Sequence, residues 1–249
     1  MIPFIELAAA LLLSSATASP RENPKLPKDL AQTIAPLFSL TIQDYFIASR
    51  WDRPGTANAV EFRSVIPFEA WGQENLVRVN IPFRTESELG PGLSDVRVFD
   101  LIMFKHPNGI WGIGPVINLG INKGPGSDEF QAGPVLTYLW TSIRGLSIGV
   151  LSQNFFSSQT SLSAIQPILA YQPAPLWTIG LGELPLVYNW KKGAFVVTSF
   201  GLQLGYLARI GAQPVRFFVN PQFNTTSSSE LYHWTITSGV TFPLQPIVP

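Results

Sequence analysis

The sequence predicts an all-β protein, an antiparallel up-and-down transmembrane β-barrel of about twelve strands. Three observations predict this fold class. Only 13% of the residues are charged, while 46% are hydrophobic and 12% aromatic, and soluble domains carry roughly 25% charged residues. Beyond the N-terminal segment no apolar stretch reaches the ~20 residues that a membrane helix needs. Short segments of alternating polarity, separated by turn residues, fill the rest of the chain.

The N-terminal segment resembles a secretory signal peptide. An apolar run at 7–13 precedes the small-x-small triplet Ala16-Thr17-Ala18, which predicts cleavage before Ser19. Proline and lysine then dominate a short polar stretch. We therefore expect three parts, which are a signal peptide (1–18), a periplasmic linker (19–36) and an outer-membrane β-barrel (37–249).

Runs rich in Val, Ile, Phe, Tyr, Trp and Thr, bounded by Gly, Pro, Asn, Asp and Ser, mark the strands. Their number is even, as is usual in single-chain bacterial barrels. The pattern is weakest in the ninth segment, where Glu183 interrupts the alternation. The expected strands are 37–48, 58–69, 74–85, 93–105, 109–122, 129–141, 144–155, 162–172, 176–189, 194–209, 214–224 and 231–242.

Each predicted strand has one apolar and one polar face, because side chains alternate with period two. In the last strand Trp234, Ile236 and Val240 share one face, and Thr235 and Thr237 share the other. Several prolines fall inside strands, where bulges or strand ends are expected. Aromatic residues gather near strand ends, as in the girdles of a membrane interface: Trp71, Trp111, Tyr138, Trp140, Trp177, Tyr188, Trp190, Tyr232 and Trp234.

Connection lengths agree with this arrangement. Alternate connections are tight, as at 70–73 and 106–108, whereas others, such as 50–57 and 123–128, are longer and more polar. Outer-membrane barrels have short periplasmic turns and long external loops. The predicted localisation is therefore the bacterial outer membrane.

Charged residues on the predicted inward face are the candidate site. By our assignment five arginines face three acids, Glu61, Asp95 and Glu129. One interpretation is a paired ladder that plugs the lumen, because buried charges need partners. The other is an arginine-lined constriction that favours anions. The candidate lumen and selectivity residues are Glu61, Arg63, Arg78, Arg84, Asp95, Arg97 and Arg216.

The sequence does not predict an enzyme, a metal site or a cofactor. It has no cysteine and two histidines, His106 and His233, without a metal-binding spacing. Ser199 and Ser238 are candidate nucleophiles by residue type only, because no nucleophile motif surrounds them. Net charge is zero without a basic cluster, which argues against a nucleic-acid partner.

Five strings support a family resemblance: Gly92-Leu93-Ser94-Asp95-Val96, Trp111-Gly112-Ile113-Gly114-Pro115, Ala132-Gly133-Pro134, Gln166-Pro167-Ile168-Leu169-Ala170-Tyr171 and Ile210-Gly211-Ala212-Gln213-Pro214-Val215. In this order they resemble the bacterial proteins described as putative MetA pathway of phenol degradation, or as transporters. The resemblance covers 37–243. It implies an outer-membrane barrel that moves small, often aromatic or hydrophobic, compounds, and it supplies no established catalytic residues to carry over to this chain.

These inferences predict an outer-membrane channel or transporter for small, aromatic or anionic molecules. Its expected partners are outer-membrane lipid, lipopolysaccharide, the outer-membrane assembly machinery and a small-molecule solute. Two alternatives stay open. One is a plugged structural or binding barrel, and the other is a soluble periplasmic β-barrel that binds a hydrophobic ligand.

Overall fold

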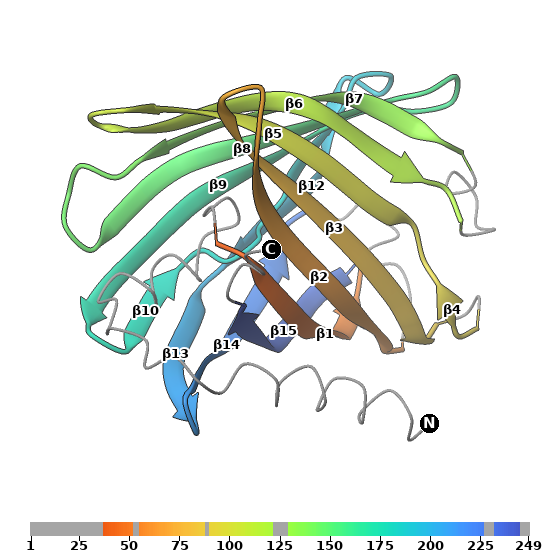
Figure 1. Cartoon of the computed structure of the whole chain (residues 1–249). Coiled ribbons are helices and arrows are strands. Elements are labelled where there is room, and N and C mark those ends of the chain that lie inside the picture. The colour runs from red at the N-terminus through yellow and green to blue at the C-terminus, as the bar shows by residue number, and fades with distance from the viewer. Residues whose placement is uncertain (1–36, 52–54, 88–89, 122–128, 227–231, 245–249) are drawn as a thin grey trace.

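The structure is a computed structural model that describes residues 37–51, 55–87, 90–121, 129–226 and 232–244. These residues form one antiparallel sheet that closes into a barrel of twelve wall strands, as predicted (Figure 1). The predicted signal peptide and linker lie outside the described residues. No helix in the described part of the chain is long and apolar enough to cross a membrane.

Most wall strands are continuous. They are β1 (Ser39–Arg50), β2 (Ala57–Ala70), β3 (Gln73–Glu86), β5 (Val96–His106), β6 (Gly109–Leu119), β7 (Gln131–Trp140), β8 (Leu146–Phe156), β9 (Ser161–Ala174), β14 (Gln213–Asn224) and β15 (Tyr232–Pro243). The ninth wall strand is split into β10 (Trp177–Gly180) and β11 (Leu186–Asn189), and the tenth into β12 (Ala194–Gly201) and β13 (Gln203–Ile210). The short β4 (Gly92–Leu93) pairs with β3 at one rim.

The barrel closes where the last strand meets the first. β1 pairs with β15 from Ser39↔Pro243 to Arg50↔Tyr232, and with β2 on its other side. Tight turns such as 71–72 and 211–212 lie at one rim, which we call the short-turn rim. Longer connections, such as 120–130, lie at the opposite, long-loop rim. The predicted asymmetry of the connections is therefore present.

The prediction that 176–189 forms one strand is wrong. Gly180 pairs with Ala170, and Leu186 pairs with Ile165. The five residues 181–185 between these pairs therefore lie opposite only four residues of β9, 166–169, so the ladder cannot continue in register. Pro167 and Pro185 cannot donate to the ladder at this point. The tenth strand is also interrupted, at Leu202, so its prediction as a single strand 194–209 is wrong as well.

Other strand prolines lie at gaps in the ladder, which is how the sheet accommodates them. Pro115 of β6 is paired with Pro134 of β7. The β5–β6 ladder skips 114–115, and the β7–β8 ladder skips 133–134. The nitrogen of each proline, which carries no hydrogen, therefore lies on the side of the strand where the ladder is interrupted.

The apolar face of the sheet is the outer one. Large hydrophobic side chains project from the wall and are exposed, for example Phe62 (44%), Leu136 (46%) and Ile236 (42%). A continuous exposed apolar belt is foreign to a soluble surface and suits lipid contact. This arrangement contradicts the soluble barrel with a hydrophobic interior.

The inner wall has two different sides. From β2 to β9 an apolar cluster lines it, made of Val65, Leu76, Phe99, Leu101, Met103, Val116, Val135, Leu139, Leu151, Phe155 and Ile168. On β1 and β14–β15 the inner residues are polar, including Thr41, Gln43, Asn220, Gln222 and Thr237. The sequence-based interpretation assigned the polar face of each strand to the lumen and did not predict this apolar side.

Candidate functional site

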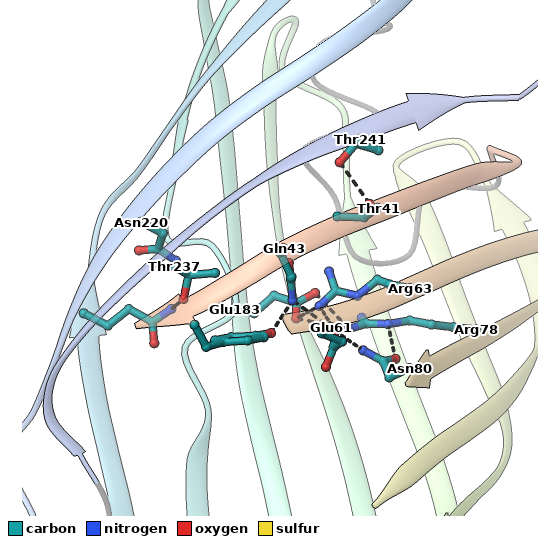
Figure 2. A network of polar contacts seen from close by, with 12 residues as sticks. Thr41, Gln43, Glu61, Arg63, Arg78, Asn80, Glu183, Asn220, Thr237 and Thr241 are labelled. Atoms are coloured by element: carbon teal, nitrogen blue, oxygen red, sulfur yellow. Dashed lines mark hydrogen bonds and ion pairs between the residues drawn. The ribbon is translucent and has the colours of Figure 1, made fainter. Parts of the chain in front are cut away.

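Side chains of β1, β2 and β3 meet around one carboxylate on the inner wall (Figure 2). Glu61 Oε1 accepts hydrogen bonds from Arg63 Nη2 (2.9 Å) and Gln43 Nε2 (3.0 Å). It also accepts one from Asn80 Nδ2 (2.6 Å). Arg78 Nε in turn donates to Asn80 Oδ1 (2.9 Å). These residues occupy inward positions on neighbouring strands, so the strand register brings them together.

A second carboxylate reaches this group from the far wall. Glu183 lies 2.5 Å from Arg63 Nη2 and 3.0 Å from Arg78 Nη2. The strand order places the segment that carries Glu183 about half a turn of the barrel away from β2 and β3. The two ion pairs therefore cross the lumen. We call Glu61, Arg63, Arg78, Asn80 and Glu183 the crossing network.

The interruption of the ninth strand is what frees Glu183 to reach the lumen. Gly182 has a φ of +67°, a conformation that side chains with a Cβ rarely adopt. A Cβ at Gly182 would also lie 2.0 Å from Asn220 Nδ2. Leu184 is buried, with 2% exposure, and fixes the far side of the segment. Residues 181–185, which we call the strap, thus carry an acid inward between two anchored ends.

The crossing network is electrically balanced. It joins two arginines to two glutamates, and their side chains are between 5% and 24% exposed. Sequence reasoning counted Glu129 as inward and omitted Glu183, an exchange that leaves five arginines against three acids. The network itself is balanced because only two of the five arginines belong to it. The interruption of the alternation at Glu183 was the signal that could have found this acid.

The structure places Glu129 outside the lumen, which corrects that assignment. It precedes β7 at the long-loop rim, where its carboxylate accepts hydrogen bonds from the hydroxyls of Ser157 and Ser158. The Gln159 amide donates to it as well (3.3 Å). These hydrogen bonds lower the pKa of Glu129, because they stabilise its charged form.

Three of the predicted arginines share one register row of the sheet. Arg216 is paired with Thr241, Thr241 with Thr41, and Thr41 with Arg63, on successive neighbouring strands. Arg63 continues through Asn80 to Arg97. Because strands in a barrel are tilted, such a row climbs the wall. Arg216 lies near the short-turn rim, Arg63 at mid-strand and Arg97 near the long-loop rim.

The remaining candidate residues lie outside the crossing network. Arg216 Nη2 donates to Gln203 Oε1 (2.7 Å), and its guanidinium lies 5.1 Å from the ring centre of Phe218. Arg84 has its Nε and Nη1 buried without a hydrogen-bond partner in the structure.

Asp95 and Arg97 line a separate cavity beside β6 and β7. The structure therefore divides the predicted set into a central network and flanking arginines.

His233 and the two candidate serines make different contacts in the structure. The His233 ring packs 3.9 Å from that of Trp51, centre to centre, at a bulge in the β1–β15 ladder. Its Nδ1 lies 3.4 Å from Ser49 Oγ. Ser199 instead shares a hydrogen bond with the Tyr232 hydroxyl (2.8 Å), and Ser238 is paired with Asp44.

Comparisons with known proteins show the fold. No protein-family model and no curated protein matches the sequence. Among solved structures, a NanC porin matches with a TM-score of 0.57 at 12% identity, covering 83% of this chain and 100% of the porin. The COG4313 outer membrane channel from Pseudomonas putida F1 matches with a TM-score of 0.54 at 11% identity, covering 83% and 95%.

A KdgM porin in complex with disordered oligogalacturonate matches with a TM-score of 0.51 at 11% identity, covering 83% of this chain and 99% of the porin. These identities relate the chains by architecture and leave the resemblance to the MetA-pathway proteins unconfirmed. The chain has the closed twelve-stranded antiparallel β-barrel fold of small outer-membrane channels.

Proposed function

We propose that this chain is a channel of the bacterial outer membrane for small anionic or amphipathic molecules, with no catalytic role. The crossing network carries the proposal, because it places two arginines in the lumen and holds them with an acid from the opposite wall. The passage is then constricted at the network. The exposed apolar belt is the contact surface for lipid and lipopolysaccharide, and folding into the membrane requires the assembly machinery.

The arginines of the crossing network are held more firmly than Glu183, and this difference favours the passage of anions. Arg63 and Arg78 lie on paired strands, which hold them in place. Glu183 lies on the strap, which leaves the ladder, so it is the charge that can withdraw. A solute carboxylate can then replace Glu183 in the same guanidinium pair without leaving the arginines unpaired. The register row supplies further arginines toward both rims, as in anion-selective pores.

A closed barrel is the second candidate. The crossing ion pairs and the apolar cluster both occupy the lumen, and a filled interior is how smaller barrels are stabilised. In a closed barrel the network is structural and no solute passes. The resemblance to the MetA-pathway proteins and the oligogalacturonate bound by the KdgM porin support the channel instead.

Conductance separates the two candidates. We expect purified protein in planar bilayers to conduct, and Glu183→Ala to increase the single-channel conductance by opening the constriction. Glu129→Gln, which removes an acid outside the lumen, should conduct like the wild type. Liposome swelling in acetate provides a second reading of solute flux. If wild-type protein and Glu183→Ala neither conduct nor admit acetate, the barrel is closed and the proposed function is wrong.

A further inference from the structure

A second candidate site lies in the lumen toward the long-loop rim. It is a cavity of about 260 Å³ between β5–β9 and β11. Its lining combines one cation and one acid with two amides and an apolar wall. The lining residues are Asp95, Arg97, Asn118, Gln131, Phe155, Leu162, Ala164 and Val187.

The polar side of this cavity has unused hydrogen-bonding capacity. The Arg97 guanidinium carbon lies 5.0 Å from the ring centre of Phe155, and its Nε is buried without a hydrogen-bond partner. A buried unsatisfied donor is costly, so a ligand that accepts from it gains free energy. A carboxylate is the acceptor that a guanidinium binds best.

The other side of the cavity is apolar. Phe155 is buried, and Leu162, Ala164 and Val187 complete this wall. Ligand sites commonly pair such a wall with a few placed polar groups. We infer that the cavity binds a monocarboxylate with a compact apolar body, whose carboxylate contacts Arg97 and whose body packs on Phe155. This inference rests on the proposed function, because the ligand would be the transported solute.

Asp95 restricts the ligand to a single negative charge. It lines the same cavity and accepts a hydrogen bond from Asn118 Nδ2 at 3.5 Å. A second carboxylate on the ligand would face either Asp95 or the apolar wall, and both contacts are unfavourable. The cavity therefore selects against dicarboxylates.

Titration calorimetry on protein in lipid nanodiscs tests the site, with empty nanodiscs as the blank. The probe is cyclohexanecarboxylate, and the matched neutral probe is cyclohexylmethanol. We expect Arg97→Gln to weaken binding of the acid by about tenfold or more, because a charge-assisted hydrogen bond is lost. Asp95→Asn should tighten it by about fourfold, because a like charge is removed. The alcohol should bind weakly and respond to neither change.

Arg84→Gln is the matched control, because Arg84 is an inward arginine of β3 that does not line the cavity. Heat-modifiable gel mobility confirms that each variant is folded. The inference is overturned if Arg97→Gln binds the acid as tightly as the wild type, or if the alcohol binds equally well. Weaker binding by Asp95→Asn would also overturn it, because that result indicates a cation site.

Conductance of the same preparations distinguishes this inference from the proposed function. Binding without conductance would refute the channel and retain the carboxylate site. Conductance without binding would refute the site and retain the channel.

Discussion

Replacing Glu183 by Gln removes one of the two acids that hold Arg63 and Arg78. Removing one partner of a buried ion pair costs about 3–5 kcal/mol. Glu61 and Asn80 remain bonded to the arginines, and Glu183 is 24% exposed, so we expect a loss at or just below the lower end of this range, about 2–3 kcal/mol. Urea unfolding in liposomes, followed by tryptophan fluorescence, measures this loss. Glu129→Gln is the control for loss of an acid at the long-loop rim, and its free energy of unfolding should stay much closer to that of the wild type.

The same substitution should make the lumen more selective for anions. Two unit charges ~4 Å apart interact by about 1 kcal/mol in bulk water, which corresponds to about a fivefold change in an equilibrium. We therefore expect the anion-to-cation permeability ratio, measured as a reversal potential in a salt gradient, to rise about fivefold.

The double variant Arg63→Gln/Glu183→Gln restores the charge balance and should recover both properties in part. An unchanged free energy of unfolding together with an unchanged reversal potential would show that the crossing ion pairs do not form.

Three further predictions concern other parts of the barrel. Gly182→Ala should lower the free energy of unfolding by about 1–3 kcal/mol, because Ala is strained at φ +67° and its Cβ meets Asn220; a wild-type urea midpoint would contradict the strap geometry. The Gln159 amide resonance should titrate with Glu129, whose hydrogen bonds lower its pKa, so the contacts persist above the usual carboxyl pKa of about 4.3 and are lost below it; a midpoint above that value would contradict the prediction. Leu136→Arg, on the outer face, should cost up to about 2–4 kcal/mol in a bilayer, whereas equal stability would argue that this face does not contact lipid.

Much of the barrel could be predicted from the sequence because the alternation of side chains depends on local geometry. Polar and apolar residues keep their faces along β3, where Val77 and Val79 point outward and Arg78 and Asn80 are buried within the barrel. Composition and loop length then identified the apolar face as the outer one. These signals extend over a few residues each, so the number of wall strands and the approximate bounds of the continuous ones follow from them.

The crossing network could not be predicted, because it depends on the closed barrel. Glu183 is separated from Arg63 by 120 residues and meets it across the lumen. The register row from Arg216 to Arg97 likewise needs the pairing of every intervening strand. A sequence identifies which residues face inward, whereas tilt and register decide which inward residues meet.

The interruption of the ninth strand nevertheless has a local cause that the sequence displays. Gly182 and Pro185 flank Glu183, and Pro167 lies on the neighbouring strand where the ladder fails. Within the described residues the sheet gives no strand partner to 182–185. At membrane depth, unpaired backbone is tolerated only where protein or a water-filled cavity satisfies it. Protein meets part of this requirement, because Asn220 Nδ2 donates to the Leu181 carbonyl (3.5 Å). In the constricted channel that we propose, water in the lumen would satisfy the remaining backbone groups of the strap.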